Sequence, residues 1–374
     1  MIWSLIPLQD TTIYESDPYR NAGLDQILEL RKDGDSSTSD LTESRILLKF
    51  DISGLSNILS DNGLTINSIS ASLRLHTVRE SQLPQTYTLE AKPISTNWAN
   101  GTGYALYPPD IFSNQSITDG ATWISSAGTG SATWSSSYVN SSGTNLIYND
   151  SSSIGGGVWY TSSIASQSFT FKTDDVVNID VTNMVKNWHN STFTNNGMLV
   201  TFNHNQIISS SYPETNIQFY SSDTHTVFSP QLFISWTGSI AYNTGSLSVI
   251  TYEDSPVIYA RSYRGEFFKD KKIRILLGAR PRYPRASFAQ NSVFLTTKAL
   301  PQNCYYQIKD AHNNEIIIPY SQYTKINTNS SGSYFDIYTT MLYAERYYRF
   351  EIKAEFTDVT EYFDSNEFTF KIIK

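Results

Sequence analysis

The 374-residue sequence predicts an all-β protein built from two β-sandwiches. Aromatic residues make up 14% of the chain, with 25 Tyr and 7 Trp, whereas charged residues make up only 17%. This composition is rich in residues that favour strands and poor in residues that build helices. Short runs of alternating apolar and polar residues, separated by Gly, Asp, Asn and Ser, recur along the chain. Regularly spaced runs of this kind indicate antiparallel sandwiches rather than alternating strands and helices.

The first domain begins with five strand-like runs. In the clearest of them, Ala71, Leu73 and Leu75 would share one face of a strand, and the polar residues between them would share the other. Such alternation predicts a sheet with one buried face and one solvated face. The expected strands, in order, are 11–15, 26–30, 45–51, 69–76 and 86–91.

Residues 100–167 differ in composition from the sequence on either side of them. They are rich in Ser, Gly, Thr and Asn, and they contain isolated Trp residues. Long loop insertions cost a sandwich little additional entropy, and they often form binding surfaces. We expect an ordered insertion whose aromatic residues attach it to the sandwich. The alternative is a glycan-binding platform in which Trp123, Trp134 and Trp159 stack against a sugar.

The rest of the first domain contains the one helix that the sequence predicts. Within 180–189, the residues Val181, Met184, Val185 and Trp188 are spaced as one apolar face of a short amphipathic helix. Strands are expected on either side of it, at 168–172, 198–202, 217–220 and 230–236. A jelly-roll-like sandwich with one short helix would thus span 1–237, followed by a linker at 238–246.

The second domain, 247–374, is expected to be an immunoglobulin-like sandwich. Six or seven strand-like runs with turn signals between them fit into this length. The runs are 247–252, 273–277, 293–297, 305–309, 334–338, 347–356 and 368–374. The single cysteine, Cys304, excludes an intrachain disulfide and any metal site made of several cysteines. Core packing must therefore hold this domain together.

The net charge of −8 is divided unevenly between the two domains. Residues 1–237 contain 10 Lys and Arg against 21 Asp and Glu, a net charge of −11, whereas the remainder contains 17 against 14, a net charge of +3. Basic residues are concentrated in 261–285, where the candidate docking residues are Arg261, Arg264, Lys271, Lys272, Arg274, Arg280, Arg282 and Arg285. These side chains either line solvated strand faces and a loop or dock on an acidic protein surface. Because no nucleic-acid-binding motif accompanies them, we do not expect a nucleic-acid partner.

An ordered series of motifs in the first domain resembles the DNRLRE family. The motifs are DTTIYE (10–15), NAGLD (21–25), ILEL (27–30), SRILLKFDIS (44–53), ISASLRL (69–75), NW (97–98), VNIDVTNMVKNW (177–188), NGMLV (196–200) and SPQLFISW (229–236). The match covers about residues 5–236, and the order of the motifs makes it specific. The resemblance implies a β-sandwich of the carbohydrate-binding-module type, found on extracellular proteins and in phage virion proteins.

Two features favour a virion protein over a secreted one. The first residues show no basic segment and no cleavage-like site, so no secretory signal is expected, whereas many family members follow one. The opening WSLIPLQD (3–10), combined with an immunoglobulin-like second domain, resembles structural proteins of tailed bacteriophages. We therefore expect a non-enzymatic virion protein of the neck, collar, tail or head fibre. It would be made in the host cytoplasm and would contact other virion proteins and copies of itself. The alternative is a carbohydrate-binding or adhesion module that recognises a bacterial surface glycan.

The sequence contains no catalytic motif. Its five His residues fall in no metal-binding spacing, and its Gly-rich segments lack the pattern of a phosphate-binding loop. We therefore expect no enzyme; a polysaccharide-cleaving activity is a further alternative. Ca²⁺ is the one ion that the sequence favours, with Asp33, Asp35 and Asp40 as candidate ligands, although carboxylates in turns also make local hydrogen bonds. Apolar runs are far shorter than the ~20 residues that cross a bilayer, so no membrane partner is expected.

Overall fold

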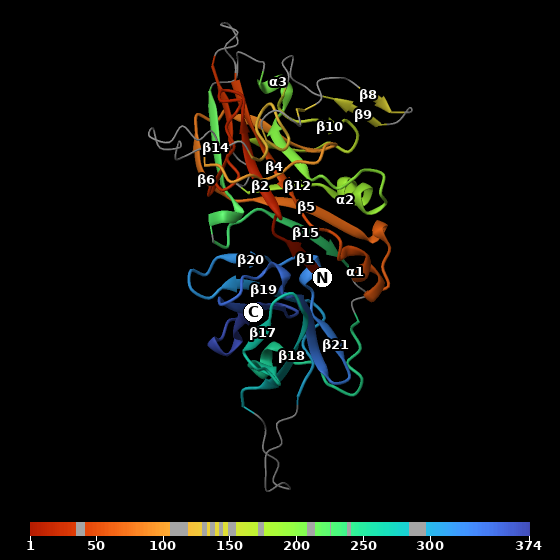
Figure 1. Ribbon diagram of the computed structural model, residues 1–374. Coiled ribbons are helices and arrows are strands. Elements are labelled where there is room, and N and C mark those ends of the chain that lie inside the picture. The colour runs from red at the N-terminus through yellow and green to blue at the C-terminus, as the bar shows by residue number, and fades with distance from the viewer. Residues whose placement is uncertain are drawn as a thin grey trace, which may run out of the picture. The chain divides into compact units, whose positions relative to one another are not determined.

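The computed structural model describes residues 1–34, 42–104, 119–128, 133–134, 139–141, 145–148, 155–170, 176–207, 214–224, 226–237, 241–283 and 297–374. These residues form two compact units. The N-terminal unit is Leu5–Phe233, and the C-terminal unit is Ile234–Lys374 together with Met1–Ser4. Antiparallel sheets dominate both units (Figure 1), so the predicted all-β sandwich class is confirmed.

The largest sheet of the N-terminal unit has eight strands. Seven of them follow the order β11 (Ala165–Thr170), β7 (Thr86–Pro93), β13 (Met198–Phe202), β4 (Thr42–Lys49), β3 (Ile27–Asp33), β14 (Thr215–Tyr220) and β6 (Thr77–Ser81). The eighth, β2 (Gln9–Tyr14), also pairs with β4. A three-stranded sheet lies within the 100–167 insertion and contains β8 (Val139–Ser141), β9 (Asn145–Tyr148) and β10 (Trp159–Tyr160).

A further sheet places β15 (Gln231–Trp236), β5 (Ile69–Leu75) and β12 (Val177–Asp180) side by side. The predicted alternation along β5 is present, since Ala71, Leu73 and Leu75 are at most 2% exposed. All of β1 (Ile2–Leu5) except Leu5 belongs to the C-terminal unit, where the Trp236 amide donates to the Met1 carbonyl oxygen at 3.0 Å.

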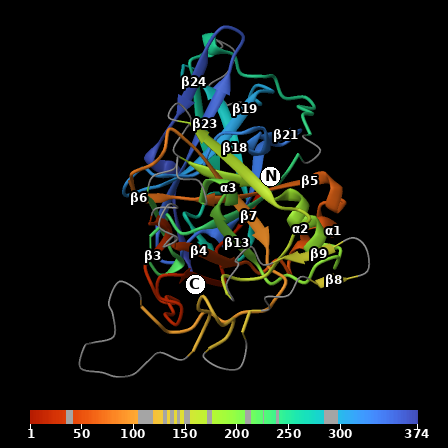
Figure 2. The same ribbon diagram turned by 90° about the horizontal axis from the view of Figure 1, so that it is seen from above.

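Among the described residues, three short α-helices accompany the N-terminal strands, whereas the sequence pattern predicted one. The expected helix is α2 (Thr182–His189), and the two further helices are α1 (Leu55–Asp61) and α3 (His204–Ile207). Helices α1 and α2 lie side by side in Figures 1 and 2, and Ser56 Oγ is 3.4 Å from His189 Nε2. In α1, Leu55, Ile58 and Leu59 are buried at the i, i+3, i+4 spacing of a helix that rests on a core.

The described residues of the C-terminal unit form two sheets. The four-stranded sheet has the order β16 (Pro256–Arg261), β18 (Lys272–Pro281), β22 (Gly332–Tyr338) and β21 (Asn327–Asn329). The six-stranded sheet has the order β17 (Glu266–Phe268), β25 (Thr369–Ile373), β23 (Tyr347–Glu355), β19 (Cys304–Asp310) and β20 (Ile316–Ile318), and β24 (Thr360–Phe363) also pairs with β23. Strand β17 runs parallel to β25, and the other pairs are antiparallel.

Aromatic rings fill the space between these two sheets. Phe335 of β22 stacks on Tyr306 of β19 with ring centroids 4.2 Å apart, and it meets the edge of Phe350 of β23 at 5.4 Å. Phe350 in turn stacks on Phe368 at 4.5 Å. All four rings are at most 2% exposed. The core that joins the sheets therefore consists of contacts between large rings, with no disulfide.

Candidate functional site

The three candidate sugar-stacking tryptophans lie in the interior of the N-terminal unit. Trp123, Trp134 and Trp159 are each at most 2% exposed. They form one buried cluster with Ile13, Leu47, Ile94, Trp98, Ala121, Val158 and Leu199. Even the polar edge of one ring is used internally, because Trp134 Nε1 donates to the Thr122 carbonyl oxygen at 2.9 Å.

Arg45 of β4 lies against two rings of this cluster. Its guanidinium carbon is 4.8 Å from the centroid of the Trp123 ring and 5.3 Å from that of the Trp159 ring. Its Nε donates to Glu43 Oε1 at 3.0 Å, and its Nη1 donates to the Gly156 carbonyl oxygen at 2.6 Å. Arg45 is only 3% exposed, so its charge needs a partner inside the unit, and Glu43 is that partner.

These contacts contradict one prediction and confirm its alternative. A sugar stacks on a ring face that solvent can reach. The rings of Trp123, Trp134 and Trp159 are buried instead, and Arg45 covers two of them, so the prediction that they form a glycan-binding platform is wrong. The aromatic residues attach the described parts of the insertion to the sandwich, as the first interpretation expected.

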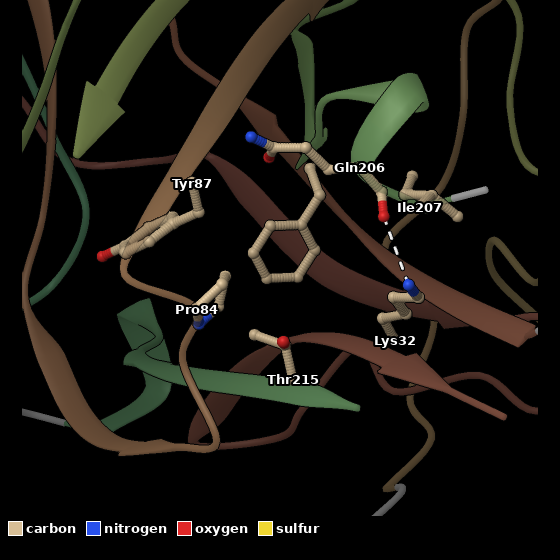
Figure 3. Close-up of a pocket in the computed structure, with 7 residues that line it drawn as sticks. Lys32, Pro84, Tyr87, Gln206, Ile207 and Thr215 are labelled. Carbon is tan, nitrogen blue, oxygen red and sulfur yellow. Dashed lines mark hydrogen bonds between the residues drawn. The ribbon is translucent and has the colours of Figure 1, made fainter. Parts of the chain in front are cut away.

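Figure 3 shows a small depression in the N-terminal unit. It is lined by Lys32, Pro84, Tyr87, Phe202, Gln206, Ile207 and Thr215. The centre of a water molecule can move within only about 10 Å³ of this depression. The depression therefore holds about one water molecule and is too small for a sugar ring. Lys32 Nζ already donates to the Gln206 carbonyl oxygen at 3.2 Å. This depression is therefore too small to be the site of a ligand larger than water.

The candidate docking residues fall into two groups in the C-terminal unit. The first group lies on one face of the four-stranded sheet and consists of Arg261, Lys272, Arg274 and Arg280. The second group lies outside these strands at exposed positions and consists of Arg264, Lys271 and Arg282. Arg285 lies outside the described residues. The structure thus brings together half of the eight residues that the sequence indicated.

Alternation along β18 places the first group on the outer face of the sheet. Ile275 and Leu277 are at most 2% exposed and face the core, whereas Leu276 between them is 38% exposed. Arg261 and Tyr334 are the partners of Leu276 on the two neighbouring strands, and cross-strand partners point to the same side. We name this surface the cationic face and define it by Arg261, Lys272, Arg274, Leu276, Arg280 and Tyr334.

Asp336 is the one acidic residue at the outward positions of these four strands, all of which are described. It is 4% exposed, and Arg274 donates to its two carboxylate oxygens at 2.7 and 2.9 Å. These hydrogen bonds raise the pKa of Arg274 above its usual value. Arg274 also lies 4.3 Å from the centroid of the Tyr334 ring. Since four cations share the face with one carboxylate, the face keeps a net positive charge.

The outer face of the six-stranded sheet differs, because its charges are paired. The pairs there are Lys309 with Glu351 at 2.5 Å, Arg349 with Asp364 at 2.9 Å, and Lys353 with Glu355 at 2.7 Å. Each of these cations has an acidic partner on the same unit. Of these two outer sheet faces, both in the described part of the unit, the cationic face is the one on which cations outnumber carboxylates.

Sequence reasoning did not identify Leu276, Tyr334 or Asp336 as parts of this surface. Alternation in 273–277 was a signal for Leu276, because an apolar residue out of phase with Ile275 must face outward. Tyr334 and Asp336 join the face only through the pairing register of β18 with β22, which no local pattern specifies.

Of the three calcium candidates, the structure describes only Asp33. This residue ends β3 and forms an ion pair with Arg31. Asp35 and Asp40 lie outside the described residues. Across the described part of the chain, no group of three or more His, Cys, Asp or Glu side chains is arranged to hold a metal ion. The calcium site therefore stays a prediction.

Comparison with family models, with curated proteins and with solved structures gives no match for this chain. The resemblance to the DNRLRE family therefore stays a prediction that rests on the motifs quoted above. Within the described ranges, every helix is too short or too polar to cross a membrane.

Proposed function

We propose that the chain is a non-enzymatic structural protein of a tailed-phage virion, in the neck, collar, tail or head fibre. The C-terminal unit attaches to the particle through the cationic face, and the N-terminal unit is displayed. The single observation that carries the attachment is the composition of this face, where four cations surround an exposed leucine and a tyrosine and one buried carboxylate offsets them.

The cationic face has the composition of a protein-binding surface. Protein interfaces are enriched in Arg and aromatic residues and place an apolar anchor near their centre. Leu276 is such an anchor, since Arg274 and Arg261 flank it on its own strand and the neighbouring one. The Arg274 guanidinium is already held in a bidentate pair with Asp336. This pair disfavours phosphate recognition, because a phosphate would have to compete with that carboxylate.

The uneven charge of the chain supports the proposed orientation. An acidic partner attracts the positive face of the C-terminal unit, and it repels a unit that carries a net charge of −11. The resemblance of the motif series to a family with phage virion members supports the virion setting. Other virion proteins, and other copies of this chain, are the partners that the proposal expects.

The experiment is to look for the chain in purified particles. Particles from a lysate of cells that carry the gene are banded by density, and their proteins are quantified by mass spectrometry. Gold-labelled antibody against the chain is then located on the particles by electron microscopy. We expect peptides of the chain in a fixed ratio to the capsid protein, and label at one site of the particle. Particles that contain no copy of the chain would overturn the proposal.

A further inference from the structure

Two aromatic rings point outward from the six-stranded sheet of the C-terminal unit. Phe268 of β17 is 58% exposed, and Tyr347 of β23 is 57% exposed. Their neighbours along the chain point the other way, because the Phe267 ring lies 5.7 Å from the Phe370 ring and Tyr348 is 1% exposed. Since successive side chains of a strand point to opposite faces, Phe268 and Tyr347 both lie on the outer face of the sheet.

Strand β25 runs between the two rings and places them on one surface. Phe268 is the partner of Ile373 on this strand, and Tyr347 is the partner of Lys371. Ile372 between them is 0% exposed, so Lys371 and Ile373 both face outward. Lys371 Nζ lies 5.9 Å from the centroid of the Tyr347 ring. The two exposed rings therefore flank the same short stretch of β25.

A second row across the same sheet repeats this combination of rings and a lysine. Tyr305 of β19, Lys353 of β23 and Tyr362 of β24 are cross-strand partners. Lys353 Nζ lies 5.7 Å from the centroid of the Tyr305 ring, and Tyr362 is 56% exposed. We name this surface the aromatic face and define it by Phe268, Tyr305, Tyr347, Lys353, Tyr362, Lys371 and Ile373.

The cations on the outer side of this sheet are neutralised within the unit. The outward positions of its six strands, all of which are described, carry four cations. Lys309, Arg349 and Lys353 each lie within 2.9 Å of a carboxylate oxygen, and Lys371 Nζ is 2.5 Å from Glu345 Oε2. A strongly charged partner therefore gains little here, whereas a second copy of the chain meets no repulsion. The cationic face, by contrast, would repel its own copy.

The size of the aromatic face is close to what a stable pair of chains needs. Strand β23 has nine residues, so it is about 30 Å long, and the five strands from β17 to β20 span about 20 Å. The face thus covers roughly 600 Å² in projection, and its side chains add to this area. Each partner in a stable protein interface buries about 800 Å².

We propose that the aromatic face binds the same face of a second copy of the chain. The two copies form a closed two-fold pair, in which the exposed rings of each copy pack against the sheet of the other. Large rings suit this contact, because aromatic residues are enriched among the anchors of protein interfaces. This inference goes beyond the proposed function, since pairing of the purified chain requires no virion.

The test is sedimentation equilibrium of the purified full chain between about 1 and about 100 µM. The variants are Phe268→Glu and Tyr347→Glu, each of which places a carboxylate on the aromatic face of both copies. Ile316→Glu is the matched control, because Ile316 is 38% exposed on β20, the edge strand farthest from β17 in the same sheet. Melting curves verify that the three variants keep the fold, as expected for exposed side chains.

Hydroxyl-radical footprinting of the unaltered chain then locates the contact. Oxidation of Phe268 and Tyr347 is compared at low and at high chain concentration. Tyr252, which is 50% exposed and lies on neither sheet, is the internal reference. Pairing through the aromatic face should protect the first two rings at high concentration and leave the oxidation of Tyr252 unchanged.

We expect a monomer–dimer equilibrium in the wild type. Each of the two aromatic-face variants should raise its dissociation constant by about tenfold or more, and Ile316→Glu should leave it unchanged. A chain that is monomeric at every concentration would overturn the inference, and so would pairing that both variants retain or that Ile316→Glu also abolishes. Oligomers that keep growing with concentration would overturn it too, because a closed pair leaves no aromatic face free. None of these outcomes depends on whether particles contain the chain.

Discussion

Removal of the Arg45 guanidinium tests whether this side chain holds the tryptophan cluster together. The change is Arg45→Met, which keeps much of the side-chain volume and removes the charge. In the wild-type chain, Glu43 faces Arg45 with their side chains 8% and 4% exposed, and Glu43 Oε2 also accepts from Thr201 Oγ1 at 3.3 Å. The variant leaves a buried carboxylate without its cation.

The expected loss in the free energy of unfolding is about 3 kcal/mol. Breaking a buried ion pair from one side costs roughly 3–5 kcal/mol, and we take the lower end because Thr201 still donates to Glu43. The double variant Arg45→Met with Glu43→Gln removes the stranded charge as well. It should therefore recover about half of that loss or more.

The assay is urea unfolding monitored by tryptophan fluorescence. The free energies of unfolding of the three proteins are obtained by the same linear extrapolation to zero urea. Four of the seven Trp residues belong to this cluster, so the cluster contributes to the fluorescence change. A loss below about 1 kcal/mol in the single variant would refute the reasoning, because it would mean that water solvates Glu43. A double variant as unstable as the single one would refute it too.

Three further predictions concern buried groups. Burial raises the pKa of Asp10 from 3.8 to about 6, so the native state binds the carboxyl proton more tightly than the unfolded state does. The free energy of unfolding should therefore fall as the pH rises from 3.8 to about 6. Relative to Asp10→Asn, the free energy of unfolding of the wild-type chain should fall by roughly 3 kcal/mol between pH 3.5 and pH 7. Curves of unfolding free energy against pH that run parallel for the two proteins would contradict this. Because Trp134 is 1% exposed, Trp134→Ala should lower the free energy of unfolding, measured in urea, by about 3–5 kcal/mol. A loss of less than about 0.5 kcal/mol would mean that the ring is exposed in solution. Burial raises the pKa of Cys304 to about 12, so its thiol should react with a disulfide reagent at pH 8 only as fast as the protein unfolds, and a rate equal to that of free cysteine would show an open core.

The local sequence pattern was sufficient to predict strands and helices that bury one face and expose the other. The alternation in 69–75 predicted the buried face of β5, and the spacing of Met184, Val185 and Trp188 predicted the buried face of α2. The spacing of Leu55 and Ile58 carried the same helical signal, but seven residues rich in Ser and Asn also resemble a turn. Four-residue α3 is too short for any periodicity to show.

The site depended on contacts that no local pattern specifies. Trp159 is buried among residues that are distant in the sequence, since Arg45 and Lys92, both more than 60 residues earlier in the chain, lie over its ring. Tryptophans in a Ser- and Gly-rich insertion have the same sequence pattern whether they anchor the insertion or bind a sugar. The basic stretch 261–285 likewise predicted a positively charged surface but not which of its cations lie together. Only the strand register, including that of β18 with β22, showed which cations share a face with Leu276.

Attachment through the cationic face is the central claim, and one measurement tests it directly. Copies of the chain per particle are counted by quantitative mass spectrometry for the wild type, Leu276→Glu and Ile316→Glu. Both wild-type residues are 38% exposed, but Leu276 lies on the cationic face and Ile316 lies on β20 of the other sheet.

A glutamate at position 276 neutralises part of the face and places a carboxylate against an acidic partner. We expect Leu276→Glu to reduce the copies per particle by about tenfold or more, while the matched Ile316→Glu leaves them at the wild-type number. Particles that carry as many copies of the Leu276→Glu chain as of the wild type would contradict attachment through this face.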